Sequence, residues 1–390
     1  MDTPRVILHL DLDAFFCAVE EIKDPGLRGK AFAVGGSPSG RGVVTSCSYP
    51  ARKMGVRSAM PAAKALQLCP DLILVSRNHR DYGRYSKLVM ERLANYTDQV
   101  EQISIDEAFL DITDLGSSPR AIGIELQKTI LGELGLPNSV GIASNKLVAK
   151  IATDVGKIAH KGEGPPNAIT IVPAGEERSF LAPFPVDMLW GVGPKTRERL
   201  ERFNIRTIGD LAEYPEVELA NKFGKHGYDL SRRAKGIDKS GIVTQRGIKS
   251  VSNERTFGED LGRKSEVLKH INKLSDQVSK RLIKKDLRGK TIQIKLRWAD
   301  FTTLTRQITL PQTTNEYRVI QKTSEELLNQ VWQEGRRVRL IGVGVHNLDT
   351  DAHQLGLWDT DYQRNIKLQE ALKDIKSKYG ENVISRGIKK

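Results

Sequence analysis

Residues 6–13 (VILHLDLD) and residues 104–107 (SIDE) carry most of the information about the fold, because each places carboxylates beside an apolar, strand-like run. In the first stretch apolar residues alternate with period two, so His9, Asp11 and Asp13 are expected on one face of a strand. Carboxylates brought together at strand ends are typical of a divalent-cation site, since hard cations such as Mg²⁺ prefer oxygen ligands and share them with phosphates. Asp13 shares a face with Asp11, so spacing alone cannot exclude it as a ligand.

The bulk composition describes a multidomain globular protein. The chain has 390 residues, 39% hydrophobic and 28% charged, which indicates two to four domains. No apolar run approaches the ~18–20 residues that span a bilayer. The three cysteines show no CxxC spacing, so neither a zinc site nor a disulfide framework is expected. The N-terminus runs directly into a strand without a signal peptide, and we expect a cytoplasmic protein.

A net charge of +13 favours a polyanionic partner, and nucleic acid above all, although a basic protein can also bind nothing acidic. In such a protein the acidic positions Asp11, Asp106 and Glu107 are better explained by a metal site than by solubility. Two cations held by carboxylates activate an attacking oxygen and stabilise the leaving group of a phosphoryl transfer.

Periodicity predicts an α+β sheet domain in the first half of the chain. Its expected strands are 6–13, 31–34, 42–46, 72–75, 100–105, 108–112, 139–143 and 168–172, and its main helices are 82–96, 121–134 and 146–155. Residues 176–235 read as wholly helical, and residues 239–249 as a basic interdomain linker. A second, intensely basic α+β domain follows, with helices at 266–286 and 317–332 and strands at 291–298, 302–310 and 337–345.

The helical region contains a glycine motif in residues 190–196 (WGVGPKT). Gly191, Gly193 and Lys195 fit a turn that offers backbone N–H groups and a helix N-terminus to a phosphate. A dinucleotide-binding loop or a plain helix turn is the alternative. The segment before the motif is not a strand, which argues against a dinucleotide fold. We therefore expect contact with the DNA backbone that does not depend on sequence.

Four blocks in order resemble the Y-family of lesion-bypass DNA polymerases, of the bacterial polymerase IV type. They are residues 11–16 (DLDAFF), 48–56 (SYPARKMGV), 104–111 (SIDEAFLD) and 141–150 (GIASNKLVAK). The resemblance covers nearly all of residues 5–348 and implies a multidomain α+β right-hand polymerase. The implied division is a palm at 1–12 and 80–172, fingers at 13–79, a helical thumb with a helix-hairpin-helix at 173–238, a linker at 239–246, a little finger at 247–348 and a tail at 349–390.

The resemblance also implies roles for individual residues. Asp11, Asp106, Glu107 and the Leu12 carbonyl match the ligands of two Mg²⁺ ions, which leaves Asp13 out. Phe16 matches the steric gate against a ribose 2′-hydroxyl, and Phe15 backs the sugar. The other nucleotide contacts that it implies are Thr45, Tyr49, Arg52 and Lys157. From the residues alone, the two phenylalanines read as core, and Tyr49, Arg52 and Lys157 as a solvated polar surface.

In the little finger the resemblance implies contacts with the duplex backbone. The residues concerned are Lys249, Ser250, Arg255, Arg297, Arg306, Arg336 and Arg339. The tail contains a sequence similar to the pentapeptide that binds a sliding clamp, formed by Gln354, Leu355, Gly356, Leu357 and Trp358. One departure from the family stands out: residues 158–167 replace a short Pro-Asn-Gly turn.

The sequence thus predicts a monomeric, Mg²⁺-dependent DNA polymerase that acts on primer-template DNA and deoxynucleotides and bypasses lesions with low fidelity. Small residues expected over the nascent base pair, among them Thr45, apply little shape pressure. Two other classes of protein stay open. One is a palm-type nucleotide cyclase or transferase with the same carboxylates. The other is a catalytically silent DNA-binding protein.

Overall fold

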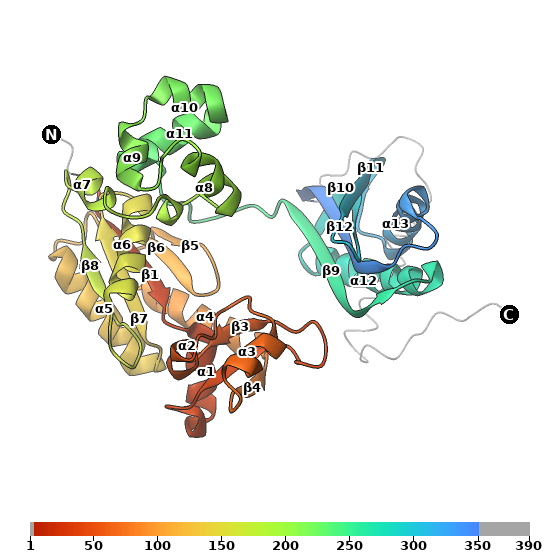
Figure 1. Ribbon diagram of the computed structural model, residues 1–390, viewed down its shortest axis with the longest axis horizontal. Coiled ribbons are helices and arrows are strands. Elements are labelled where there is room, and N and C mark those ends of the chain that lie inside the picture. Colours follow the sequence, from red (N-terminus) through yellow and green to blue (C-terminus); the bar gives the residue numbers. More distant parts are fainter. Residues whose placement is uncertain (1–3, 351–390) are drawn as a thin grey trace. The chain divides into compact units, whose positions relative to one another are not determined.

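The computed structural model describes residues 4–350 (Figure 1). The chain divides into two compact units, Met1–Gly247 and Ile248–Lys390, and each is described by itself. Both units contain helices and sheets, so the predicted α+β multidomain class is correct. No helix within residues 4–350 is long and apolar enough to cross a membrane.

The first unit is built on a five-stranded sheet with the order β5-β6-β1-β7-β8. Its strands are β1 (Ile7–Leu12), β5 (Val100–Gln102), β6 (Glu107–Asp111), β7 (Asn138–Ala143) and β8 (Ile169–Ile171). The central strand β1 pairs antiparallel with both β6 and β7, so the first predicted strand lies in the middle of the sheet. The helices that flank the sheet are α4 (His79–Ala94), α5 (Pro119–Leu134) and α6 (Lys146–Ala159).

The two faces of β1 serve different purposes. Leu8, Leu10 and Leu12 pack into a core with α4 and α5. Ile7 belongs to a second core that contains the apolar side of α6. Alternation along a strand therefore turns His9 and Asp11 toward α6, and the period-two pattern predicted correctly that the two residues share a face.

A smaller three-stranded sheet follows β1, with the order β3-β2-β4. Its elements are α1 (Phe15–Lys23), the 3₁₀ turn Pro25–Leu27, β2 (Phe32–Gly35), β3 (Val44–Cys47), α2 (Tyr49–Lys53), α3 (Ala62–Leu68) and β4 (Ile73–Ser76). The turn from β1 into α1 is tight, because Ala14 adopts a left-handed conformation with φ 48°. Backbone strain of this kind is concentrated at functional sites.

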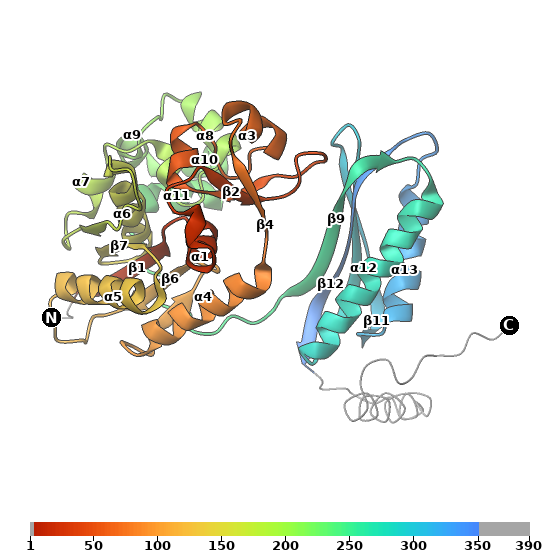
Figure 2. The same cartoon turned by 90° about the horizontal axis from the view of Figure 1, so that it is seen from below.

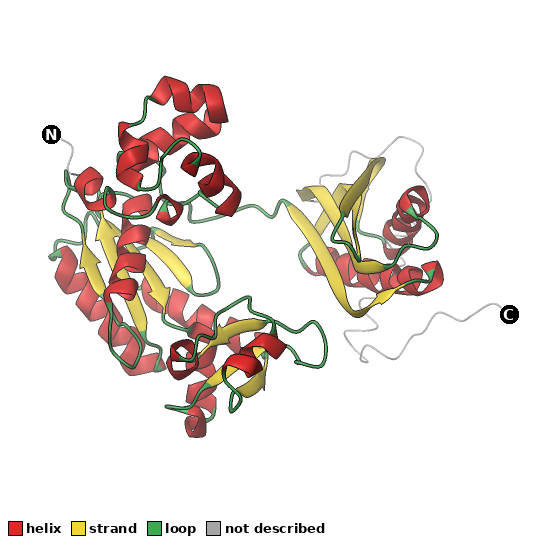
Figure 3. Cartoon of the chain, viewed as in Figure 1, coloured by secondary structure: helices red, strands yellow, loops and turns green. Residues whose placement is uncertain are grey.

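The segment from Glu177 to Ala234 contains helices joined by turns and loops, with an isolated bridge between Pro185 and Thr207 but no strand, as Figure 3 shows by colour. Its elements are α7 (Glu177–Leu181), the 3₁₀ turn Val186–Met188, α8 (Pro194–Glu201), α9 (Ile208–Glu213), α10 (Glu216–Phe223) and α11 (Lys225–Ala234). The predicted all-helical character of this segment is correct.

The start of the expected linker is fixed to the first unit. Lys146, at the beginning of α6, donates to Gly241 O at 2.7 Å and pairs with the fully buried Glu101 at 2.9 Å. Glu101 also accepts from Val243 N–H and from Arg246. Removing one partner from such a buried network leaves an uncompensated charge, which is strongly destabilising. The chain therefore leaves the first unit only after Arg246.

The second unit is a four-stranded antiparallel sheet with the order β11-β10-β12-β9. Two helices pack on one of its faces (Figure 2). The elements are β9 (Ser250–Leu261), α12 (Lys264–Lys284), β10 (Leu287–Trp298), β11 (Thr303–Thr314), α13 (Tyr317–Val331) and β12 (Val338–Thr350). The sequence analysis missed β9. It is an edge strand in which only Val251 and Phe257 are buried, so its apolar alternation is too sparse to detect.

Candidate active site

The backbone brings the three candidate metal ligands to one end of the central sheet. Asp11 and Glu107 are directly opposed partners on β1 and β6, and the N–H of Leu12 donates to the carbonyl of Asp106 at 3.0 Å. Opposed positions in an antiparallel pair share a face, and like charges there are destabilising. This end of the sheet therefore gathers oxygen donors at a cost in stability.

Lysines from α6 offset that cost. Lys157 Nζ lies 2.5 Å from Asp11 Oδ1, and Lys150 Nζ lies 2.9 Å from Glu107 Oε2. Asp106 accepts from the hydroxyl of Ser104. With each carboxylate held separately, residues 4–350 contain no group of three His, Cys, Asp or Glu side chains arranged to hold a metal ion. The donor set nevertheless suits a hard divalent cation, because it consists of adjacent carboxylate oxygens.

The protonation of Asp11 reflects this crowding. Burial raises the pKa of its carboxyl to about 7, and Glu107 and Asp106 add to the rise, while Lys157 opposes it. Burial alone would lower the pKa of Lys157, but Asp11 and Asp13 outweigh it and raise it. A carboxylate that one lysine stabilises incompletely is suited to accept a second cation.

Asp13 differs from Asp11 although the two share a face. Its side chain is fully buried, and both oxygens accept from the Ser139 hydroxyl at 3.0 Å. It also accepts from the backbone N–H of Asn167 at 3.1 Å and pairs with Lys157 at 3.1 Å. Its lone pairs are thus engaged by protein groups. Spacing alone could not exclude Asp13 as a metal ligand. The hydrogen bonds argue against that role, because both carboxylate oxygens of Asp13 are already bonded to protein groups.

Helix α6 supplies a row of side chains in which the sequence analysis gave a role to Lys157 alone. Lys150, Thr153 and Lys157 follow a spacing of i, i+3 and i+7, which puts them on one helix face. Thr153 Oγ1 lies 2.9 Å from Nδ1 of the buried His9. Burial lowers the pKa of His9 to about 4, so its ring is neutral at pH 7. The heptad-like spacing on α6 was the signal that could have revealed this row.

Glu107 is held in its ionised form. The neighbouring His9 imidazole and the Lys150 ammonium both lower the pKa of its carboxyl, and burial opposes them. His9 Nε2 lies 3.8 Å from Glu107 Oε2, which is too long for a hydrogen bond. The carboxylate is therefore bonded to Lys150 and only approached by His9.

The expected nucleotide contacts lie around the same end of β1. Phe15 is buried, whereas Phe16 is half-buried and stacks on Tyr82 with ring centroids 4.3 Å apart. The guanidinium of Arg52 lies over the ring of Tyr49 at 4.8 Å. The pKa of Tyr49 is raised, first by burial and then by the charge of Asp13, which indicates that α2 faces the acidic cluster. Thr45 lies half-buried on β3.

The glycine motif forms the entry to α8. Gly191 has φ 102°, a conformation that strongly favours glycine. Gly193 is the N-cap of α8 with no side-chain cap, and Lys195 is exposed in its first turn. Exposed N–H groups beside a lysine are suited to a phosphate.

The little-finger candidates do not form one row. Arg297 on β10 faces away from the helices, because its neighbours Leu296 and Trp298 are buried among them. Register pairs Arg306 with Ile294 and Arg255 with Ile341, so both arginines lie on the helix-covered side, on the two edge strands. Lys249 and Ser250 are exposed at the start of β9. Arg336 pairs with Asp300 at 2.6 Å, and Arg339 lies over the ring of Phe301.

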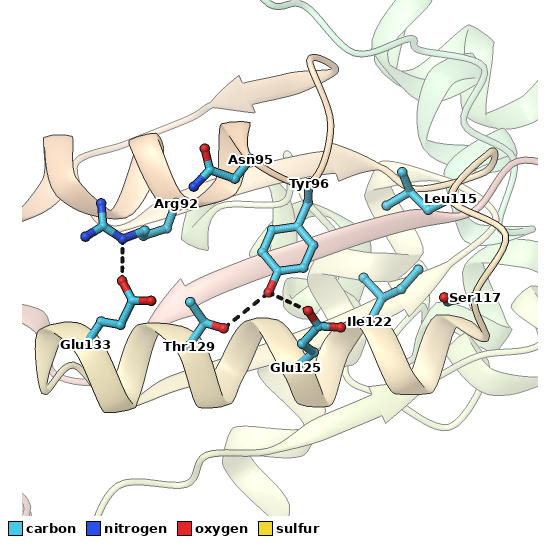
Figure 4. Close-up of a pocket in the computed structure, with 9 residues that line it drawn as sticks. All are labelled: Arg92, Asn95, Tyr96, Leu115, Ser117, Ile122, Glu125, Thr129 and Glu133. Atoms are coloured by element: carbon cyan, nitrogen blue, oxygen red, sulfur yellow. Dashed lines mark hydrogen bonds and ion pairs between the residues drawn. The ribbon is translucent and has the colours of Figure 1, made fainter.

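A hollow of about 620 Å³ lies between α4 and α5 (Figure 4), and Asp11, Asp106 and Glu107 are not among the residues that line it. Its polar groups bond to one another: Arg92 pairs with Glu133 at 2.6 Å, and Tyr96 contacts Thr129 and Glu125. These contacts join the two helices, so the hollow is better explained as a brace than as a second site.

Comparison with known proteins agrees with this arrangement. Residues 10–154 match the impB/mucB/samB family, residues 248–357 match the C-terminal domain of that family, and residues 187–238 match the thumb domain of DNA polymerase-iota. A Y-family DNA polymerase chimera of Dbh and Dpo4 has a similar structure, with a TM-score of 0.77 and 26% identity over 88% of this chain and 98% of that one.

Curated relatives are more similar in sequence. DNA polymerase IV of Listeria innocua is 40% identical over 89% of this chain and 96% of its own length. DNA polymerase IV of Desulfatibacillum aliphaticivorans is 38% identical over 98% of this chain and 96% of its own. These matches identify the chain as a nucleotidyl-transferring DNA polymerase. Within that class, the chain belongs to the Y-family of DNA polymerases, in its DNA polymerase IV group.

Proposed function

We propose that this chain is a template-directed DNA polymerase that adds deoxynucleotides to a primer 3′ end and continues past damaged template bases. The observation that carries the proposal is the opposition of Asp11 and Glu107 across β1 and β6, with Asp106 joined to Leu12 by a backbone hydrogen bond. Three acidic side chains next to Lys150 and Lys157 suit the transfer of a nucleotide.

Asp11, Asp106, Glu107 and the Leu12 carbonyl would hold two Mg²⁺ ions. Bound Mg²⁺ lowers the pKa of the attacking hydroxyl and neutralises charge on the phosphates. Lys157 already neutralises Asp11 at 2.5 Å, and it can turn to a triphosphate once another cation takes its place. Glu107 lies at the end of β6 nearest the expected primer terminus.

The nucleotide would be held from the fingers. Arg52 can reach two phosphate oxygens with one planar fork, and Tyr49 supports its guanidinium from below. Phe16, stacked on Tyr82, is fixed in place and would exclude a ribose 2′-hydroxyl, with Phe15 behind it. Thr45 would form part of a thin roof over the base pair, which accounts for tolerance of distorted templates.

DNA would be held through its backbone. We assign Gly191, Gly193 and Lys195 to a phosphate contact in the thumb, and the seven little-finger residues of the sequence analysis to duplex phosphates. We also propose the division into palm (1–12, 80–172), fingers (13–79), thumb (173–238), linker (239–246), little finger (247–348) and tail (349–390). The break between the two compact units after Gly247 supports the boundary between linker and little finger.

The proposed sliding-clamp contact involves Gln354, Leu355, Leu357 and Trp358, which lie outside the described residues. The enzyme is proposed to act as a monomer in the cytoplasm.

Primer extension tests the proposal. The assay uses Mg²⁺, all four deoxynucleotides, and a template with and without an abasic site. Wild-type protein should extend both templates, and Asp106→Ala should abolish extension. Asp114→Ala, which removes an exposed carboxylate just beyond the other end of β6, is the matched control and should behave as wild type. Failure of the wild type to extend, or full activity of Asp106→Ala, would leave the proposal without support.

A further inference from the structure

His9 has a buried nitrogen that nothing in the proposed reaction uses. The residue is fully buried, and its Nε2 makes no hydrogen bond. Buried polar atoms without a partner are few in native proteins, and each needs an explanation. This nitrogen points toward Glu107, whose Oε2 lies 3.8 Å away.

The ring is fixed from two sides. It packs on Phe109 with ring centroids 4.7 Å apart, and its Nδ1 lies 2.9 Å from Thr153 Oγ1. Thr153 reaches the ring because α6 passes very close to β7 at Gly141. A Cβ at Gly141 would lie 2.0 Å from Ala149 O and 2.6 Å from Thr153 Oγ1. Residues from β6, β7 and α6 thus determine where Nε2 points.

The charge of Glu107 selects the tautomer of His9. The neutral ring carries one proton, and the nitrogen without it presents a lone pair. A lone pair aimed at an ionised carboxylate would be repelled, whereas an N–H is attracted. The proton therefore belongs on Nε2, and the Thr153 hydroxyl donates to Nδ1 rather than to Ala149 O or His9 O, which lie 3.1 and 3.3 Å from it.

We propose that His9 is a positioning residue for Glu107, a role that rests on the proposed polymerase function. In the free protein Glu107 bonds to Lys150 at 2.9 Å, and Nε2–H stays just beyond hydrogen-bond range. When Lys150 is drawn toward substrate phosphates, the carboxylate loses that partner. A shift of ~1 Å then brings it into a hydrogen bond with Nε2–H, which keeps its orientation toward the primer end.

Three substitutions separate positioning from packing. His9→Gln keeps a donor near the place of Nε2, His9→Asn keeps one only near Nδ1, and His9→Phe keeps the ring and its contact with Phe109 but no donor. If His9 serves only packing, His9→Phe should retain the most activity. If His9 positions Glu107 through Nε2, His9→Gln should retain the most activity.

Single-turnover incorporation of one correct deoxynucleotide measures the effect. We expect His9→Asn and His9→Phe to lower the maximal rate roughly ten- to a hundredfold, the range for a hydrogen bond to a charged group. We expect His9→Gln to stay within about threefold of wild type by the same reasoning, and the apparent nucleotide Kd to stay within about threefold in all three. Equal rates for His9→Gln and His9→Asn, or a loss seen only in nucleotide Kd, would overturn the proposal.

A second measurement does not depend on activity or on any variant. ¹⁵N NMR of the imidazoles in wild-type protein, without metal or DNA, reports which nitrogen of His9 carries the proton. The proposal requires Nε2–H, and a proton on Nδ1 would refute it even in an active enzyme. A correct tautomer in a wild-type protein that extends no primer would instead refute the polymerase function and leave the geometry standing.

Discussion

Replacing Asp11 with Asn should stabilise the metal-free protein in a pH-dependent way. The pKa of the Asp11 carboxyl rises from 3.8 to about 7 on folding, and the largest cause is the burial of the side chain. Between these two values the folded state keeps a proton that the unfolded state has lost, so the stability of wild type falls as the pH rises through this window. The free energy of unfolding falls by about 1.4 kcal/mol per pH unit across this window. Above pH 7 the wild type has therefore lost roughly 4 kcal/mol of stability.

Asn resembles the protonated carboxyl and is never charged, so the stability of Asp11→Asn does not fall as the pH rises through this window. Lys157 keeps Asp13 as a partner at 3.1 Å, and no buried cation is left unpaired. From pH 5 to pH 8 the stability gap between variant and wild type should widen by roughly 2–3 kcal/mol. For a unit of this size that is a difference in Tm of roughly 4–12 °C.

Thermal unfolding in EDTA at pH 5, 6, 7 and 8 checks this. Asp114→Asn, which changes an exposed carboxylate, should track wild type at every pH. Added Mg²⁺ should raise the Tm of wild type and leave Asp11→Asn nearly unchanged, because binding to the native state stabilises it. A gap that stays constant with pH, or a variant less stable than wild type at pH 8, would refute the idea that Asp11 is held at a cost.

Three further outcomes are expected. Phe16→Ala should increase the ratio of ribonucleotide to deoxynucleotide incorporation, measured in single-nucleotide kinetics, and an unchanged ratio would remove Phe16 from the gate role. Arg297→Ala and Arg306→Ala should each weaken duplex binding and lower the slope of log K against log salt by about one, and an unchanged slope for either variant would remove that arginine from the proposed DNA contacts. Deleting residues 354–358 should reduce clamp-dependent primer extension without changing distributive synthesis, and loss of both would indicate a folding defect instead.

The strongest sequence patterns predicted the structure well. The alternation in residues 6–13 gave both the central strand and its two faces, because one face is apolar throughout and the other carries His9 and Asp11. The long helices α5 and α12 were predicted for a similar reason, since each buries residues at helical spacing along one side. Such patterns can be read from the sequence because the apolar residues that recur along one side of a strand or helix are the ones that become buried.

The strand β9 and the distribution of arginines show where the pattern was insufficient. An edge strand with only two buried side chains carries almost no periodic signal. The face on which Arg255 or Arg306 lies depends on the register with a neighbouring strand, and a bulge or a shift of one residue reverses it. Neither property is local, so the sequence could propose these arginines as DNA contacts but not say that they lie opposite Arg297.

The insertion at residues 158–167 begins and ends beside the acidic cluster. Helix α6 continues through Lys157 to Ala159, so the lysine is fixed by regular helix before the insertion begins. The chain returns at Asn167, where a left-handed turn with φ 43° aims its N–H at Asp13. Between these points, Glu163 pairs with Lys53 of α2. Both side chains are exposed, so the pair contributes little to stability. Lys157 precedes the insertion and Asn167 ends it, and both contact the acidic cluster. The length of the insertion can therefore vary while Asp13 keeps its hydrogen bonds and Asp11 keeps its position for binding a cation.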